Sequence, residues 1–280
     1  MEKKRLINKL TSLVLAVAMV FSIVVVMPDK VSAAEKSLKP TGGTVTITDD
    51  ECYAATNGEY TWIKFKPKAD GYLQLKFSPA SAVIGYPYGT AQLYSANKVT
   101  ALSAVFNFYT DDNRNVFKSE YYGVKKNTTY YIAVASAGGV KINAKLTKVN
   151  DKSGTKKGKA LSLKKGKATT GVITAGNSKT KWYKFTLSKP SKLSFFIQPY
   201  LTGDVSVTLK GPGAGNSVSR TIQCREVRRN YDGTLDISGH SWGTKTPVYE
   251  ASYLHRKGTY YVQIKPTTKT CNGYYKITWK

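Results

Sequence analysis

The sequence predicts an all-β protein that consists of two tandem jelly-roll-like antiparallel β-sandwich domains. Apolar residues recur with a period of two along short segments, turn residues separate these segments, and the two halves of the 280-residue chain repeat each other. A period of two is typical of a strand with one buried face, because successive side chains of a strand point to opposite sides. An antiparallel sheet with one apolar face must bury that face on a second sheet, which favours a sandwich.

The first segment of the chain, residues 1–33, has the features of a secretory signal peptide. Basic residues precede an apolar run from Leu13 to Val26, and Val31-Ser32-Ala33 provides the small residues of a cleavage site. The apolar run is shorter than the ~20 residues that a membrane span needs. We therefore expect a secreted protein, extracellular or cell-wall associated, with no transmembrane segment after cleavage; an uncleaved N-terminal anchor is the alternative.

An internal repeat divides the remaining chain into two copies. Trp62-Ile63-Lys64-Phe65 matches Trp182-Tyr183-Lys184-Phe185 at an offset of 120 residues, and Tyr130-Tyr131-Ile132 matches Tyr260-Tyr261-Val262 at an offset of 130. Matches held over this length indicate one domain type used twice, with an insertion in the second copy. The expected parts are a first sandwich at 36–149, a solvated Lys-rich linker at 150–167 and a second sandwich at 168–280. As an alternative, Ala160–Leu163 begins the first strand of the second sandwich.

Alternating apolar positions place the expected strands in order along each copy. In the first copy these strands are 62–65, 73–77, 130–134 and 140–146. In the second copy the equivalent segments are 182–187, 193–195 and 260–264. Breakers such as Pro67–Gly71 and Ser188–Pro190 separate the strands. No window of the chain shows a helical period, so we expect no helix.

The second copy carries its sequence motifs in a defined order. Trp182-Tyr183-Lys184-Phe185 is followed by Thr208-Leu209, then by Gly258-Thr259-Tyr260-Tyr261-Val262, and then by Gly273-Tyr274-Tyr275. This order resembles the bacterial pre-peptidase C-terminal domain; the first copy departs from it at the Trp-Tyr pair and at the Gly-Thr turn. The resemblance implies a jelly-roll-like β-sandwich that is usually appended to secreted peptidases and other exported enzymes and has no catalytic residues of its own.

Catalytic residues, metal sites and cofactors are not expected. The chain has three Cys and two His, and they lack the paired C-x-x-C spacing of zinc sites. His240-Ser241 is the nearest approach to a hydrolytic pair, but no G-x-S-x-G elbow accompanies it. Asp111 to Asn115 begins like a calcium loop, yet Val116 occupies the position that requires Gly. Calcium at this acidic turn is the alternative.

Cys224 and Cys271 are candidates for a disulfide, because both belong to the second copy of an exported protein. The bond would close a loop of about 47 residues and stabilise the fold by about 4 kcal/mol. Two separate thiols are the alternative. If Cys224 and Cys271 form a disulfide, Cys52 is the unpaired cysteine, which is either a buried thiol or the site of an intermolecular disulfide.

Net charge gives the strongest functional signal. The chain carries 43 Lys+Arg against 17 Asp+Glu, a net charge of +26. Without residues 1–33 the charge is +23, of which +18 lies in residues 150–280. An exported protein meets teichoic acids, anionic lipids and acidic polysaccharides first, so nucleic acid is not the expected physiological partner. The candidate polyanion-binding residues are Lys152, Lys156, Lys157, Lys159, Lys164, Lys165, Lys167, Arg220, Arg225, Arg228 and Arg229.

Three tryptophans are candidates for sugar stacking. Trp62 and Trp182 lie on the strand face opposite to the predicted core, beside Lys64 and Lys184, and Trp242 lies in a Gly-rich stretch. An aromatic ring offers a flat apolar surface with polar neighbours, which suits a sugar ring. A tryptophan covered by a loop is the alternative.

These observations predict a secreted, non-catalytic tandem β-sandwich protein that binds an anionic cell-wall or extracellular polysaccharide surface. Two alternatives remain open. An accessory module for a separately encoded secreted hydrolase would co-purify with that enzyme. A structural or adhesive matrix protein would self-associate.

Overall fold

The computed structural model describes most of the chain beyond the predicted signal peptide, which itself lies outside the described residues. Ala34–Lys280 forms one compact unit. Among the described residues, no helix has the length and apolar character to span a membrane. The described ranges are 36–37, 43–47, 52–55, 60–79, 88–109, 119–137, 140–212, 217–224, 228–229, 235–236, 243–251 and 253–280.

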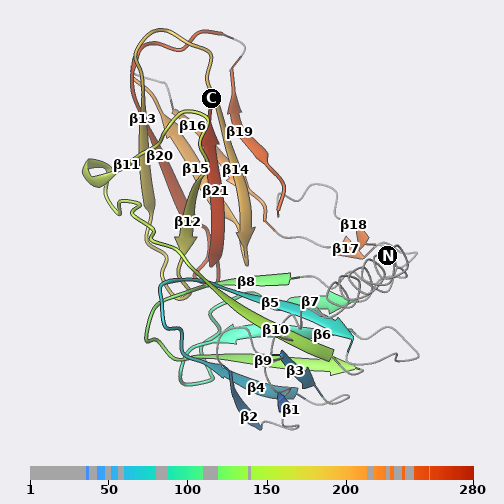
Figure 1. The fold of residues 1–280 in the computed structure, drawn as a ribbon. Helices are drawn as coiled ribbons and strands as arrows, with labels where there is room; N and C mark the ends of the chain where they lie inside the picture. The colour runs from blue at the N-terminus through green and yellow to red at the C-terminus, as the bar shows by residue number, and fades with distance from the viewer. Residues whose placement is uncertain are drawn as a thin grey trace, which may run out of the picture. The chain divides into compact units, whose positions relative to one another are not determined.

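The first sandwich contains two five-stranded sheets (Figure 1). The first sheet has the strand order β1-β3-β10-β5-β8, and the second sheet has the order β2-β4-β9-β6-β7. In these orders, the strands of the first sheet span Lys36–Ser37, Cys52–Ala55, Val140–Lys148, Gly71–Pro79 and Ser119–Val124. Those of the second sheet span Thr44–Ile47, Tyr60–Phe65, Tyr130–Ala137, Tyr88–Tyr94 and Phe106–Tyr109.

The second sandwich contains a five-stranded third sheet and a four-stranded fourth sheet. The third sheet, β11-β13-β20-β15-β16, has strands at Leu161–Ser162, Lys181–Leu187, Gly258–Pro266, Val205–Lys210 and Ser217–Ile222. The fourth sheet, β12-β21-β14-β19, has strands at Thr169–Ile173, Gly273–Trp279, Ser194–Leu201 and Thr246–Glu250. A short 3₁₀ helix spans Lys157–Lys159, and the two-stranded sheet β17-β18 joins Arg228–Arg229 to Leu235–Asp236.

The two sandwiches share one connectivity. The third sheet repeats the order of the second sheet, and β12-β21-β14-β19 repeats β3-β10-β5-β8. Ile63 pairs with Ile132, and the equivalent residues of the second copy, Tyr183 and Val262, pair in the same way. The edge pairs β2-β4 and β11-β13 are parallel, whereas the remaining pairs of these two sheets are antiparallel. The predicted class of two tandem β-sandwiches is therefore confirmed.

Each sandwich encloses its own hydrophobic cluster. In the first cluster Ile63 of β4 lies with Leu73 and Leu75 of β5, and in the second Phe185 of β13 lies with Phe195 of β14. Buried and half-buried residues alternate along the whole of β14. This is the period of two that the sequence shows, because each strand turns one face to the core and the other outward.

Backbone groups of the two sandwiches share hydrogen bonds through the buried side chain of Asn272. Its Oδ1 accepts from the Gly123 N–H of β8 at 3.0 Å, and its Nδ2 donates to the Leu102 carbonyl at 2.8 Å. The Gly123 carbonyl accepts from the Ala175 N–H at 2.8 Å. A Cβ on Gly123 would meet the Ile173 carbonyl oxygen at 2.0 Å, so the approach of these backbones requires glycine.

Four tyrosines extend this junction. The rings of Tyr72 and Tyr200 each stack on the ring of Tyr274, with centroids 3.9 and 4.5 Å apart. Tyr121 meets Tyr274 edge-on at 5.1 Å. Burial and the neighbouring phenols raise the pKa of Tyr274, which therefore stays protonated. Side chains from both sandwiches thus form one aromatic cluster.

Candidate anion-binding site

The Lys-rich segment 150–167 is built onto the second sandwich. Gly154 and Trp182 exchange two backbone hydrogen bonds. The Gly154 N–H donates to the Trp182 carbonyl at 3.3 Å, and the Trp182 N–H donates to the Gly154 carbonyl at 2.7 Å. Leu163 is buried in the second hydrophobic cluster, and its carbonyl accepts from Trp279 Nε1 at 3.3 Å. Within the predicted Lys-rich linker, Leu161–Ser162 therefore forms the strand β11, because apolar residues between the lysines dock onto the sandwich.

The lysine side chains of this segment face solvent. All seven are exposed, and within the described part of the chain none forms an ion pair. The Lys157 ammonium lies 4.6 Å from the centroid of the Tyr261 ring, and that of Lys165 lies 6.0 Å from the Trp279 ring. A fixed backbone thus displays unneutralised cations. They are Lys152, Lys156, Lys157, Lys159, Lys164, Lys165 and Lys167.

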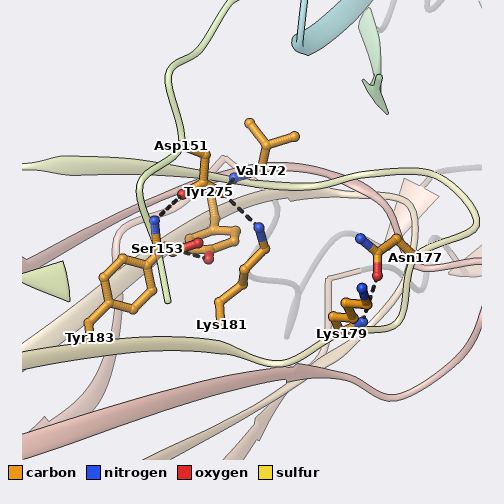
Figure 2. Close-up of polar contacts among 8 residues, drawn as sticks. All are labelled: Asp151, Ser153, Val172, Asn177, Lys179, Lys181, Tyr183 and Tyr275. Atoms are coloured by element: carbon orange, nitrogen blue, oxygen red, sulfur yellow. Dashed lines mark hydrogen bonds and ion pairs between the residues drawn. The ribbon is translucent and has the colours of Figure 1, made fainter. Parts of the chain in front are cut away.

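Asp151 fixes the start of the segment (Figure 2). Its Oδ2 accepts from Lys181 Nζ at 2.9 Å and from the Val172 N–H at 3.0 Å, and its Oδ1 accepts from the Ser153 N–H at 2.9 Å. Burial opposes the charged carboxylate, but Lys181 and the two N–H groups outweigh it and hold the pKa of Asp151 below its ordinary value. Asp151 is therefore ionised and neutralised by Lys181.

A buried tyrosine pair lies beside Asp151 (Figure 2). The hydroxyl oxygens of Tyr183 and Tyr275 are 2.7 Å apart. Burial, followed by the charge of Asp151, raises the pKa of Tyr183, and burial followed by Tyr183 raises the pKa of Tyr275. Both hydroxyls stay protonated near neutral pH, so this pair holds the strands together and offers no general base.

A cavity of about 620 Å³ opens beside the Asp151–Lys181 pair, and five lysines and two aspartates contribute to its lining. Asp151 is already paired with Lys181, and Asp70 Oδ1 accepts from the Lys126 N–H at 2.7 Å. The other four lysines are exposed and form no ion pair with any described residue, so positive charge is in excess. These four are Lys68, Lys125, Lys126 and Lys148.

Adjacent strand ends of the first sheet bring these four lysines together. Gly71, at the start of β5, pairs with Lys148 at the end of β10 and with Val124 at the end of β8. Asn127 adopts a positive φ of 62°, which Asn tolerates, and its N–H donates to the Pro67 carbonyl at 2.9 Å. This grouping was not predictable from local sequence, because Lys68 and Lys148 lie far along the chain from Lys125 and Lys126.

The predicted arginine cluster is described only in part. Arg220 is exposed on β16, and its Nη1 donates to the Pro247 carbonyl at 2.6 Å. Arg228 and Arg229 form β17, of which the backbone alone is described, and Arg225 lies outside the described residues. The role of these arginines in polyanion binding stays a prediction.

The candidate sugar-stacking tryptophans differ in their surroundings. Trp62 is half-buried, meets Tyr131 edge-on at 6.2 Å, and has Lys98 Nζ at 5.3 Å from its ring centroid. Trp182 is half-buried in β13, and Trp242 lies outside the described residues. Lys98 lies over the Trp62 ring, where a sugar would stack, and sugar stacking by the three tryptophans stays a prediction.

The structure corrects the predicted disulfide, because it holds Cys224 and Cys271 as two buried thiols. Cys224 Sγ lies 3.5 Å from the Ile222 carbonyl, and Cys271 Sγ donates to the Gly203 carbonyl at 3.2 Å. Each sulfur is thus directed at a different backbone carbonyl. Burial, with a smaller effect of Asp204, raises the pKa of Cys271 to about 12 and makes this thiol unreactive at neutral pH.

The described residues contain no group of three or more His, Cys, Asp or Glu side chains that could hold a metal ion. The calcium-loop candidate at 111–115 and the pair His240-Ser241 lie outside those residues. Calcium binding therefore stays open, and the absence of a cofactor and of catalytic residues stays a prediction.

Comparison with protein-family models and with curated proteins returns no match. Among solved structures, the pre-peptidase C-terminal domain of a collagenase from Bacillus anthracis aligns over 43% of this chain and 94% of that chain, with 13% identity and a TM-score of 0.29. Tripeptidyl peptidase 2 aligns over 88% of this chain and 24% of that chain, with 9% identity and a TM-score of 0.28. The CBM22 tandem domain from Paenibacillus barcinonensis aligns over 78% of this chain and 82% of that chain, with 12% identity and a TM-score of 0.22. Similarities at this level carry no argument about function.

Proposed function

We propose that the protein is a secreted, non-catalytic binding module that attaches to an anionic polymer of the cell wall or the extracellular matrix. The observation that supports this proposal most is the cavity beside Asp151, which is lined by four lysines that form no ion pair with a described residue. Asn150 and Asp151 belong to its wall, and the exposed lysines of the segment begin at Lys152. The cavity and the segment together offer adjoining cationic surfaces to a chain of anions.

The chemistry of lysine favours a polymer with repeated phosphate or carboxylate groups. An ammonium group is a compact, hydrated charge that contacts each anion weakly, whereas an arginine fork binds one anion in a fixed geometry. Many weak contacts give an affinity that falls as salt screens them. The backbone that carries the lysines is already ordered, which reduces the entropic cost of binding.

The test is binding of the full-length protein to purified bacterial cell wall at about 0.05 M and about 0.5 M salt, which bracket strong and weak screening. We expect retention at the low concentration and release at the high one. A variant with serine at Lys68, Lys125, Lys126 and Lys148 should bind at least about tenfold more weakly. The matched control replaces four exposed lysines outside the cavity with serine, namely Lys66, Lys76, Lys145 and Lys265.

The outcomes separate the alternatives. Equal losses in both variants would attribute binding to net charge and overturn the role of the cavity. Absence of binding at low salt would overturn the proposal itself. Co-purification of a secreted hydrolase without polymer binding would establish the accessory-module alternative, and salt-independent self-association would establish the matrix-protein alternative.

A further inference from the structure

A cluster of aromatic side chains lies at the connection between β19 and β20, outside the anion-binding site described above. It contains Tyr249 of β19, Tyr253 and His255 of the connection, and Tyr260 of β20. The His255 ring stacks on Tyr253 at 5.0 Å and meets Tyr249 edge-on at 5.2 Å. The Tyr260 ring meets the His255 ring edge-on, with ring centroids 6.0 Å apart.

Hydrogen bonds hold this connection on the sandwich. The His255 N–H donates to the Ser191 carbonyl at 2.8 Å, and the Ser191 N–H donates to the His255 carbonyl at 3.1 Å. The Tyr260 hydroxyl donates to the Arg256 carbonyl at 2.9 Å. The rings are therefore ordered before any ligand arrives, which lowers the entropic cost of binding.

Tyr253 is both organised and exposed. The residue is 63% exposed although its ring stacks on His255, and the adjacent Leu254 is 64% exposed. A large aromatic residue with this much solvent contact contributes little to a core. Much of the Tyr253 surface is thus accessible to another molecule.

A hydrogen-bond chain links the exposed ring to the histidine. The Tyr249 hydroxyl lies 3.0 Å from the Tyr253 hydroxyl and 2.9 Å from His255 Nε2. Tyr249 has one hydroxyl proton, so it can donate to one of these partners only. When His255 Nε2 carries a proton and donates to Tyr249, Tyr249 donates to Tyr253, and the Tyr253 O–H is left to donate outward.

Basic residues flank the cluster along the chain on both sides of the Ser191–His255 contact. They belong to the stretches 188–192 and 253–257, and the acidic residue beside them is Glu250. The exposed cations are Lys189, Lys192, Arg256 and Lys257. The excess of positive charge favours an anionic ligand over a neutral one.

We propose that this cluster is a subsite for a sugar ring that bears a carboxylate, such as a hexuronic acid residue of a polysaccharide. The Tyr253 ring would contact the flat face of the sugar, its hydroxyl would donate to a sugar oxygen, and the flanking cations would attract the carboxylate. The inference rests on the proposed function and deepens it, because it names the kind of polymer unit that a second, separate surface recognises.

A lipid surface fits this region less well than a sugar. An interfacial anchor buries a broad apolar face among lipid tails, whereas the exposed large apolar side chains described at this connection are Tyr253 and Leu254. The hydroxyl and imidazole groups instead match a ligand with many hydroxyl groups, because polar groups placed around an aromatic ring give orientation and specificity.

The experiment titrates the full-length protein with trigalacturonate and with its neutral methyl ester, by calorimetry and by the NMR shift of the His255 ring. We expect trigalacturonate to bind at least about tenfold more tightly than the ester. Tyr253→Ala should weaken binding by about tenfold or more, and Tyr253→Phe by about threefold, since the hydroxyl alone is lost. Leu254→Ala is the matched control, equally exposed, and should bind as the wild type does.

Equal binding of the acid and the ester would overturn the role of the carboxylate. Binding that survives Tyr253→Ala in the cavity variant with four serines, or binding of phosphatidylglycerol vesicles in place of trigalacturonate, would overturn the subsite. The cavity variant with four serines should still bind trigalacturonate. If trigalacturonate fails to bind while cell wall is retained, this inference alone fails; if cell wall is not retained but trigalacturonate binds, the wall-binding proposal fails and the subsite stands.

Discussion

Asp151 and Asn272 have hydrogen-bond partners that come from distant parts of the chain. Asp151 joins the beginning of the Lys-rich segment to Val172 and Lys181. Asn272 joins the loop before β21 to the backbone of the first sandwich. A buried polar group that loses its partner costs its full desolvation free energy, so each of these side chains constrains which backbones can meet.

We expect Asp151→Asn to lower the free energy of unfolding by about 2 kcal/mol near neutral pH, because Lys181 loses its counter-charge in a largely buried place. The pKa of Asp151 is lower in the folded than in the unfolded state. Its contribution is therefore complete above the unfolded-state pKa and disappears as the pH falls through the folded-state pKa. The stabilities of wild type and variant should therefore converge as the pH falls. Urea unfolding of both proteins at neutral pH and at successively lower pH values measures this.

The control is Asp70→Asn, an exposed aspartate without an ion pair among the described residues, which should change stability by less than about 0.5 kcal/mol. A difference between wild type and Asp151→Asn that is the same at every pH would contradict the assignment of the effect to the carboxylate charge.

At the scale of elements, the segment 154–167 shows how a few apolar residues override a run of lysines. Leu161–Ser162 forms β11 and pairs in parallel with β13, and Gly166 donates its N–H to the Trp279 carbonyl at 2.8 Å. Burial of Leu163 offsets part of the entropy lost when the segment is ordered. The lysines remain in solvent, so ordering the backbone does not require burying their charges.

We expect the amides of Gly154, Leu163 and Gly166 to exchange with solvent much more slowly than unprotected amides, since each N–H is hydrogen-bonded to a backbone carbonyl. Hydrogen exchange followed by mass spectrometry or NMR measures this protection. Leu163→Ala should weaken it along the whole segment and cost about 2–3 kcal/mol of stability. Exchange at unprotected rates in the wild type would show that the segment is a solvated linker after all.

At the scale of the molecule, the junction makes the two sandwiches depend on each other. Gly123 bonds to the second sandwich through both its N–H and its carbonyl, and four tyrosines pack beside this contact. Unfolding either sandwich would leave the buried Asn272 without part of its partners. The two hydrophobic clusters should therefore melt together.

We expect calorimetry of the full-length protein to show one cooperative transition. Gly123→Ala places a Cβ 2.0 Å from the Ile173 carbonyl oxygen and should lower the melting midpoint by roughly 5–10 °C or split the transition in two. Gly158→Ala is the control, because a Cβ there meets no atom within 4 Å. Two resolved transitions in the wild type would contradict the coupling of the sandwiches.

The strands and their partners were predictable to different degrees. The segments at 62–65 and 182–187 were predicted from alternation, and the repeat predicted that the two copies share one fold, whereas the pairing of β4 with β9 and of β13 with β20 was not predicted. The parallel pairing of Thr44–Ile47 with β4, and of Leu161–Ser162 with β13, was not predicted. An edge strand of two to four residues carries too little alternation to reveal its direction.

The candidate site was predictable only where its residues are neighbours in sequence. The lysines of 150–167 form a local run, whereas Lys68 and Lys148 approach each other only because β5 and β10 pair at Gly71. The charge asymmetry of the sequence pointed to the second half, yet the first sandwich supplies the four exposed cavity lysines. Tyr253 gave no signal, since its exposure follows from how the β19–β20 connection folds.

The sequence by itself determined the strand segments, the twofold use of one domain and the excess of positive charge, because side-chain period, repetition and composition can be read along the chain. The tertiary structure decided which lysines share a cavity and that the Lys-rich segment docks on the second sandwich. It also decided that Cys224 and Cys271 remain thiols and that the exposed Tyr253 stacks on His255. These features depend on contacts between residues far apart in the chain, which strand pairing and burial establish and local patterns do not encode.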